Sequence, residues 1–187
     1  MSKYTPQEIE DLVYRGQEFT DEDFSGMDFA GRNLAGGRFI YCNFSGSRLE
    51  GVDLYTSQFT RCNLGGAQLA GARVKQAGFL DSNAPGADFS GCELYMTNFL
   101  KCDLAGVSFA KSAMNMSSFA ECGCARLLLP EAELKQTSFL GGEFHTADLG
   151  GALLHRSVLM GVDFTACRIE GLRLDQAVIT KGNFAGM

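Results

Sequence analysis

The fifteen phenylalanines of this 187-residue chain all stand in one register, separated by multiples of five residues from Phe19 to Phe184. Where phenylalanine is missing from the register, another apolar residue usually takes its place, as Leu34 and Val74 do. A period of five matches neither the 3.6-residue period of a helix nor the two-residue period of a strand. An unbroken short period instead predicts that the whole chain is built from one small repeated unit.

Each five-residue unit places two apolar side chains two residues apart, so both point to the same side of an extended chain. In one example the small Ala87 and the large Phe89 face inward, and Asp88 between them faces solvent. The last position is often glycine, as at Gly91, and glycine suits a corner at which φ is positive. The unit therefore predicts a short strand followed by a corner.

Apolar residues twenty positions apart resemble one another. One such column consists of Phe19, Phe39, Phe59, Phe79, Phe99, Phe119, Phe139, Leu159 and Ile179. A second column begins at Leu34 and contains no phenylalanine. Likeness at twenty residues predicts four units per coil, with parallel coils stacked about 4.8 Å apart. We therefore expect an all-β solenoid, a quadrilateral parallel β-helix of about 8 coils.

The first sixteen residues lie outside the repeat. Thr5-Pro6-Gln7-Glu8 has the form of a capping box with proline at the first helical position. Apolar residues at helical spacing and a terminating glycine follow: Ile9, Leu12, Val13 and Gly16. We predict a short helix from about Pro6 to Arg15 that covers the first coil, because an open solenoid end exposes apolar side chains and strand edges. The chain then divides into a capping segment, residues 1–16, and one repeat domain, residues 17–187.

Several units share a small–polar–large pattern: Ala-Asp-Phe-Ser-Gly at Ala87–Gly91, Cys-Asp-Leu-Ala-Gly at Cys102–Gly106 and Val-Asp-Phe-Thr-Ala at Val162–Ala166. This pattern, which extends over about Gln17 to Met187, resembles the pentapeptide-repeat family, whose fold is a right-handed quadrilateral β-helix. The resemblance implies a protein-interaction module that is not an enzyme. Some members that resemble this chain mimic DNA and bind DNA gyrase or another type II topoisomerase, which protects it from quinolones or peptide toxins. Most members have no assigned activity, so a structural scaffold for an unrelated protein partner is the alternative.

The sequence gives little support for catalysis. It has two histidines, His145 and His155, at outward positions on different faces, and it has no tryptophan, phosphate loop or nucleophile elbow. The inward side chains should fill the coil, which leaves no obvious cavity. We therefore expect no catalytic residue, cofactor or metal, and no direct contact with nucleic acid.

The seven cysteines follow the same lattice. Six stand at the small inward position: Cys42, Cys62, Cys92, Cys102, Cys122 and Cys167. Cys124 stands at a large inward position, and its nearness to Cys122 invites a metal or redox interpretation. Cysteine is also a small apolar core residue, and the register favours free, buried and inert thiols. The odd number of cysteines, a start without a signal peptide and the lack of a long apolar run favour a cytoplasmic protein away from membranes.

Two outward columns are candidates for function. One is apolar, and we expect it to bind a protein partner: Ile40, Leu80, Leu100, Leu140 and Met160, with Val158 and Val178 on the same face. Contiguous exposed apolar surface usually marks an interface, although such residues also simply suit strands. The other column is acidic and could imitate DNA phosphates: Asp23, Asp103, Glu143 and Asp163. Asparagines interrupt it, so stacked amides that hydrogen-bond along the rod are the alternative.

The net charge of −6 is concentrated at the amino end. Residues 1–31 contain eight acids and two bases, which gives −6, whereas the rest of the chain has 14 acids and 14 bases. The body of the rod should therefore be nearly neutral.

Two further features concern the second half of the chain. The pattern weakens over residues 113–134, where Cys124 is small and Leu127 is large for its position, and we expect a bulge or a widened coil there. The repeat persists to Phe184 with no cap in sight. We therefore expect a homodimer through the C-terminal coil, with Ile179 and Phe184 at the contact, and a frayed last coil is the alternative. Related DNA mimics commonly dimerise through a carboxyl-terminal helix, which this sequence lacks.

Overall fold

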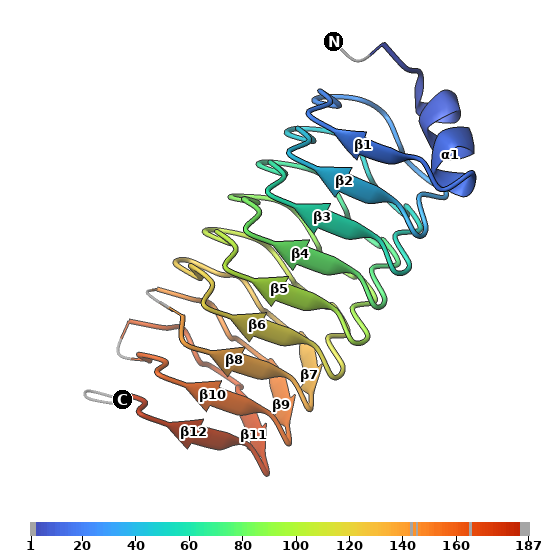
Figure 1. Cartoon of the computed structure of the whole chain (residues 1–187). Helices are drawn as coiled ribbons and strands as arrows, with labels where there is room; N and C mark the ends of the chain where they lie inside the picture. Colours follow the sequence, from blue (N-terminus) through green and yellow to red (C-terminus); the bar gives the residue numbers. More distant parts are fainter. Residues whose placement is uncertain (1–2, 143, 145, 165, 184–187) are drawn as a thin grey trace.

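The computed structural model describes residues 3–142, 144, 146–164 and 166–183 of the chain. It is a parallel β-solenoid of about eight turns with one short helix at the amino end (Figure 1). Among the described residues, one sheet stacks along the rod: β1 (Glu18–Thr20), β2 (Arg38–Ile40), β3 (Gln58–Thr60), β4 (Gly78–Leu80), β5 (Asn98–Leu100), β6 (Ser118–Ala120), β8 (Ser138–Leu140), β10 (Val158–Met160) and β12 (Val178–Thr180). A second sheet consists of β7 (Glu133–Lys135), β9 (Leu153–His155) and β11 (Arg173–Asp175).

The pairing confirms the coil of twenty residues. All the strand pairs are parallel, and their partners differ by twenty, as Phe59 and Phe79 do. On the other faces, single bridges replace three-residue strands but keep the same offset, as between Asn43 and Asn63. Every face is therefore tied in register to the coils before and after it.

Residues with positive φ turn the chain at the corners. Glycine provides many of them, such as Gly66 with a φ of 64°. The corners after the nine-stranded sheet instead often use other residues, for example Tyr41 at 56° and Arg61 at 53°. A left-handed conformation costs a non-glycine residue about 1–2 kcal/mol, so the backbone pairing between coils must hold these corners in place.

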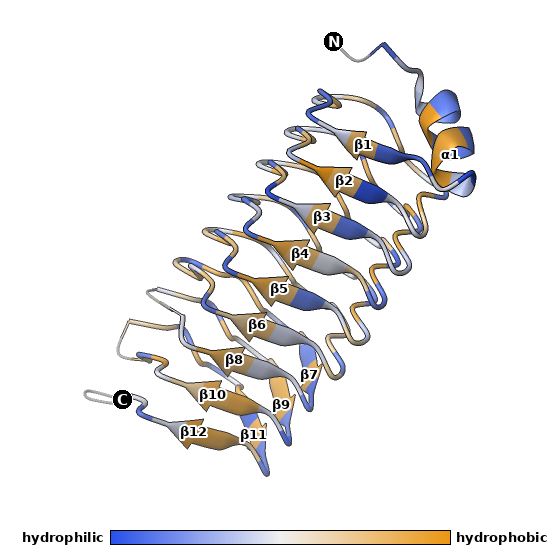
Figure 2. Cartoon of the chain, viewed as in Figure 1, coloured by the Kyte–Doolittle hydropathy of each residue, from blue (hydrophilic) through white to orange (hydrophobic). Residues whose placement is uncertain are grey.

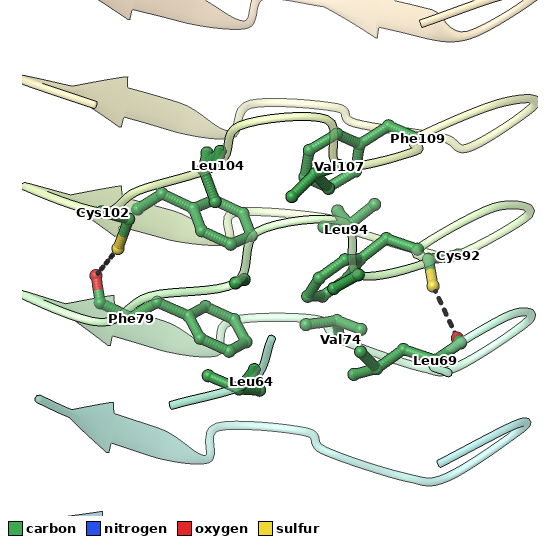
Figure 3. Close-up of a cluster of buried hydrophobic side chains, with 14 of the residues drawn as sticks. Leu64, Leu69, Val74, Phe79, Cys92, Leu94, Cys102, Leu104, Val107 and Phe109 are labelled. Atoms are coloured by element: carbon green, nitrogen blue, oxygen red, sulfur yellow. Dashed lines mark hydrogen bonds between the residues drawn. The ribbon is translucent and has the colours of Figure 1, made fainter. Parts of the chain in front are cut away.

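The core is a stack of rings and aliphatic side chains inside the coil. In the nine-stranded sheet, Phe79 lies between Phe59 and Phe99, with ring centroids 5.0 and 4.7 Å away and nearly parallel planes. Phe89, from the neighbouring face, meets the Phe79 ring edge-on at 6.0 Å. Figure 3 shows Phe79 near Leu64, with Val74 between Phe79 and Leu69 on the opposite side of the coil. The rings thus fill the interior in two directions, along the rod and across it.

The predicted helix is present as α1 (Pro6–Tyr14). Its capping box is formed, because the Thr5 hydroxyl accepts from the Glu8 backbone N–H while the Glu8 carboxylate accepts from the Thr5 backbone N–H. Ile9 and Val13 are buried against the core, as the helical apolar face predicted.

An acid on α1 fastens the helix to the first coil. The Glu10 carboxylate accepts from the Asn33 backbone N–H at 2.8 Å and from the Arg32 guanidinium at 2.9 Å. The Asn33 hydrogen bond is the main cause that holds the pKa of Glu10 below its usual value. Lys3 and Glu22 form a second ion pair beside the cap, at 2.8 Å.

Of the bulge or widened coil expected over residues 113–134, the bulge was a wrong prediction for the residues that the structure describes. The pairing continues at the usual offset, for example between Ala113 and Glu133. Both irregular residues are fully buried, Cys124 at the large position and Leu127 at the small position of the same coil. One side chain is small for its position and its neighbour is large, so the two volumes compensate within the core.

The described carboxyl-terminal coil is more exposed than the others. Ile169, Leu172 and Ile179 face inward but are only partly buried, and Leu174 is exposed. Cys167 is also partly exposed, so the prediction that every thiol is buried was wrong at this position. Phe184 lies outside the described residues. An apolar surface is therefore open at this end of the described rod.

The ring stack predicts how two neighbouring residues differ in their contribution to stability. Phe79→Ala should lower the free energy of unfolding by about 3–5 kcal/mol, because it leaves a cavity between Phe59 and Phe99. The matched control, Leu80→Ala, removes an exposed side chain and should cost less than about 1 kcal/mol. Urea denaturation followed by circular dichroism measures both, and equal losses would contradict the predicted stack.

Candidate functional site

An apolar stripe runs along the outer face of the nine-stranded sheet. We use this name for the third residues of five of its strands: Ile40, Leu80, Leu100, Leu140 and Met160. Strand pairing places Leu80 directly beside Leu100 and Leu140 directly beside Met160. Apart from Ile40, which is half-buried, the stripe is exposed. Five of the seven predicted partner-interface residues therefore lie in one row, interrupted by Thr60 and Ala120. The other two, Val158 and Val178, pair with each other in a second column of the same sheet.

The same sheet changes from polar to apolar along the rod, as its colouring in Figure 2 shows. At the amino end, Glu18 and Arg38 are paired at 3.4 Å across the first two strands. At the carboxyl end, Val158 and Val178 occupy this column, and Val178 is 52% exposed. The apolar surface is thus broadest beside the open carboxyl-terminal coil.

A shallow hollow of about 200 Å³ lies on the stripe. Its lining includes Leu80, Leu100 and Gly78, and Gly78 has no side chain to fill it. A Cβ atom at Gly78 would come within 2.3 Å of the Gln58 side chain. Ligand pockets usually enclose about 300–1,000 Å³, so the hollow is better suited to a single side chain of a partner than to a small molecule.

In the described part of the acidic column, side chains form turns and a ladder. The carboxylate or amide oxygen accepts from the backbone N–H two residues later, at 3.1 Å for Asp23 and 3.0 Å for Asp103. The Asn43 amide donates to Asp23, and the Asn63 amide donates to Asn43, both at 3.1 Å. Asp163 is paired in register with Asn183. Glu143 lies outside the described residues.

These contacts give the column a local structural role. The Ser25 side chain and backbone hold the pKa of Asp23 below its usual value through hydrogen bonds, so Asp23 is ionised at neutral pH. Amides separate it from Asp103, and Gly123 follows Asp103 in the column. The column is therefore a ladder of mixed amides and carboxylates.

On the neighbouring faces, arginines on adjacent coils pair with the carboxylates. The Arg48–Asp28 and Arg73–Asp53 pairs are both 2.8 Å long, and Arg168–Asp148 is 3.3 Å long. His155 on β9 behaves similarly, with Nδ1 2.6 Å from the Asp175 carboxylate on β11. His145, the other histidine, lies outside the described residues. Exposed pairs of this kind contribute little to stability. Each arginine nevertheless offsets the charge of the aspartate with which it pairs.

The cysteines occupy the core as small side chains. Four of them, Cys42, Cys62, Cys102 and Cys122, share one inward column, and each thiol donates to backbone carbonyls nearby. Cys92 lies on another face, and burial raises its pKa to about 12. In the ranges that the structure describes, cysteines, histidines and acids form no group of three or more that could hold a metal ion.

Sequence reasoning missed one surface feature beside this column. A depression of about 420 Å³ is lined by Glu121, Cys122, Gly123, Gly141 and Gly142. Its glycines occupy neighbouring coils, so their missing side chains coincide in space. The signal was present in the sequence, because Gly123 and Gly142 are nineteen residues apart, which is almost one coil.

Three further findings bear on what kind of protein this chain is. None of the helices among the described residues is long and apolar enough to cross a membrane. The family model for pentapeptide repeats (8 copies) matches residues 18–54, 38–76, 57–94 and 79–110. No curated protein sequence matches the chain.

Solved structures with the same fold include QnrB1, described as a plasmid-mediated fluoroquinolone resistance protein. The full-length QnrB1 structure has a TM-score of 0.70 and 18% identity, and the match covers 87% of this chain and 91% of that one. A trypsin-treated QnrB1 variant has a TM-score of 0.64 and 22% identity, and the match covers 86% of this chain and 83% of that one. HetL, from the cyanobacterium Nostoc sp. strain PCC 7120, has a TM-score of 0.46 and 17% identity, and the match covers 98% of this chain and 96% of that one. For the two QnrB1 structures, the similarity at these identities is one of fold.

Proposed function

The chain belongs to the pentapeptide-repeat family, and we propose that it acts as a non-catalytic module that binds a protein partner through the apolar stripe. The observation that carries this proposal is the row of exposed leucines on the nine-stranded sheet. From Ile40 to Met160 the stripe crosses six coil spacings, or about 29 Å. Within this span the Leu80–Leu100 and Leu140–Met160 pairs are each contiguous, and exposed apolar surface gathered in this way is typical of an interaction site.

The surroundings of the stripe support a protein as the partner. Val158 and Val178 widen it at one end, and Glu18 and Arg38 border it at the other. Protein interfaces combine an apolar centre with a polar rim and bury about 800 Å² on each side. The hollow beside Leu80 and Leu100 would accept an anchoring side chain, and such anchors contribute much of the binding energy.

A pair of single substitutions tests the stripe. Leu100→Glu should weaken capture of the binding partner from a lysate of the source organism by about tenfold or more, because it buries a charge in the contact. Leu128→Glu is the matched control, since Leu128 is also 38% exposed but lies on another face. Quantitative pull-down by each variant, with circular dichroism to verify folding, measures the effect. Equal retention by both variants would count against the stripe.

A more specific candidate is a DNA gyrase or another type II topoisomerase, bound by DNA mimicry. The fold shared with QnrB1 supports it, because that protein is described as a fluoroquinolone resistance protein. The net charge of −6 and the column of Asp23, Asp103, Glu143 and Asp163 give it a chemical basis. In this proposal the chain occupies the DNA-binding surface of the enzyme and protects it from quinolones or toxins.

A supercoiling assay tests the topoisomerase proposal. Added protein should inhibit gyrase or restore supercoiling in the presence of ciprofloxacin. Changing Asp23, Asp103 and Asp163 together to asparagine should abolish the effect, because three charges are lost while the turn hydrogen bonds remain available to the amides. If the unchanged protein neither inhibits nor rescues the enzyme, the topoisomerase proposal fails, and the stripe proposal is unaffected.

We also propose that the chain forms a homodimer through its C-terminal coil. The partly buried Ile169, Leu172 and Ile179 and the exposed Leu174 support this pairing, because a second copy would cover them. Phe184 would add to the contact. A closed two-fold pairing of this kind is the commonest arrangement of soluble oligomers.

The dimer has a direct test by light scattering. At micromolar concentration the protein should have twice the mass of its 20.2 kDa chain. Leu174→Glu and Ile179→Glu together should shift it to the monomer, because both place charge in the apolar contact. A monomer measured for the unchanged protein would overturn the pairing.

The proposed compartment is the cytoplasm. Cysteines used as small apolar core residues are compatible with a reducing environment, where thiols persist. Fractionation of the source cells would test this proposal independently of the partner.

A further inference from the structure

One tyrosine on the surface of the rod is covered by an arginine of the next coil. On the face that carries β7 further along the rod (Figure 1), the Arg73 guanidinium lies 4.8 Å from the centroid of the Tyr55 ring. The same guanidinium pairs with the Asp53 carboxylate at 2.8 Å. Tyr55 is half-buried in this arrangement. One arginine side chain therefore makes a cation–π contact and an ion pair at the same time.

The arrangement recurs two coils later without its arginine. The carboxylate is now Glu93 and the ring is Tyr95, whereas the position of the arginine is Ala113. The backbone register is the same, because Glu93 is bridged to Ala113 just as Asp53 is bridged to Arg73. Tyr95 is 40% exposed. A carboxylate and an exposed ring therefore occupy the positions that hold a guanidinium at the earlier coil.

A hollow of about 310 Å³ lies at this second arrangement, and we call it the tyrosine hollow. It is lined by Lys75, Glu93, Tyr95, Ala113 and Asn115. Its volume is at the lower end of the range for ligand pockets, which suits one long side chain. The Glu93 side chain is 57% exposed, so both the carboxylate and the Tyr95 ring can be reached from solvent.

Two further residues of the tyrosine hollow affect which ligand fits. Lys75 forms an ion pair with Oε2 of Glu93, but a carboxylate has a second oxygen for another donor. The Oδ1 atom of Asn115 is buried, and no described residue donates a hydrogen bond to it. Buried acceptors normally have a donor, and rotation of the half-buried Asn115 amide would turn this one toward a ligand. The hollow therefore offers acceptors to a cation, and Lys75 competes with that cation for Glu93.

We propose that the tyrosine hollow binds a guanidinium group, supplied by an arginine side chain of a protein partner. The guanidinium lies over the Tyr95 ring and donates to Glu93, as the guanidinium of Arg73 does at Tyr55 and Asp53. A guanidinium suits the hollow better than an ammonium, because it stacks on a ring while its fork of donors reaches a carboxylate. This face is separate from the nine-stranded sheet, so the site does not depend on the apolar stripe.

Fluorine NMR of the full-length protein labelled with fluorotyrosine tests the site. The signals of the two rings are assigned with Tyr55→Phe and Tyr95→Phe. The probe is arginine with an acetylated amino group and an amidated carboxyl group, which resembles a residue within a chain. The Tyr95 signal should shift and saturate at millimolar probe, whereas the Tyr55 signal should stay unchanged, because Arg73 already covers that ring.

Two matched probes test the chemistry of recognition. Citrulline with the same caps has the shape of arginine without its charge, and capped lysine has the charge without the planar fork. Both should bind about fivefold more weakly than the arginine probe at the same ionic strength, because the cation–π contact and the forked donors each contribute to binding.

Reciprocal substitutions should move the site along the rod. Ala113→Arg supplies a guanidinium from the chain itself, so the Tyr95 signal should no longer respond to the probe. Arg73→Ala uncovers the other ring, so the Tyr55 signal should begin to respond while Tyr95 still does. The Arg73 side chain is 47% exposed and Ala113 is half-buried, and circular dichroism verifies that both variants keep the fold. Lys75→Met should tighten binding about twofold, because it removes the competing cation.

Four results would overturn the proposal. A Tyr95 signal that does not shift would mean that no site is present, and an equal response to citrulline would mean that charge plays no part. A stronger response to inorganic phosphate than to the arginine probe would mean that Lys75 binds an anion instead. Tighter binding of free arginine than of the capped probe would mean that the ligand is a small molecule. None of these results depends on the pull-down with the stripe variants.

Discussion

The backbone pairing between coils is the interaction on which the rest of this structure depends. Each coil donates and accepts in both directions, as where Phe44 donates to Asn63 and Asn63 donates to Cys42, at 2.6 and 3.0 Å. Because partners differ by twenty residues, every side chain lies next to its equivalents in the adjacent coils. The phenylalanine stack, the leucine stripe, the asparagine ladder and the cysteine column all follow from this one offset. Corners such as Tyr41, with a φ of 56°, are tolerated because the pairing on both sides fixes them.

Much of the fold could be predicted because the same chemistry recurs at every coil. In each unit the small and the large residue point inward and the polar residue between them points outward, which defines a short strand. The similarity of apolar residues twenty positions apart then gives four faces per coil. The amino-terminal helix was also predictable, because Thr5 and Glu8 cap it through local contacts that sequence spacing reveals.

Other features could not be predicted, because they depend on volumes and on neighbours along the rod. Cys124 and Leu127 each depart from the pattern, yet both are buried in the same coil. That their side-chain volumes compensate becomes clear only once the structure places them in that coil. Cys167 follows the inward rule but remains partly exposed, because its burial depends on what covers the described carboxyl-terminal coil. In the candidate site, the order of residues in each outward column was predictable. The depression beside Cys122 was not, because it forms where glycines of neighbouring coils lie next to one another.

The two outward columns differ in how well they could recognise a partner. Asp23 and Asp103 are four coils apart, or about 19 Å, and the positions between them carry neutral amides. Duplex DNA has one negative charge per about 1.7 Å of its axis, so this part of the column has a charge density about an order of magnitude lower. The amides also have a sufficient structural reason to be there, because they hydrogen-bond to one another and to the turns. The leucines of the stripe have no comparable role inside the fold, since their exposed side chains leave the core unchanged. The physical case for recognition is therefore stronger for the apolar stripe than for the acidic column.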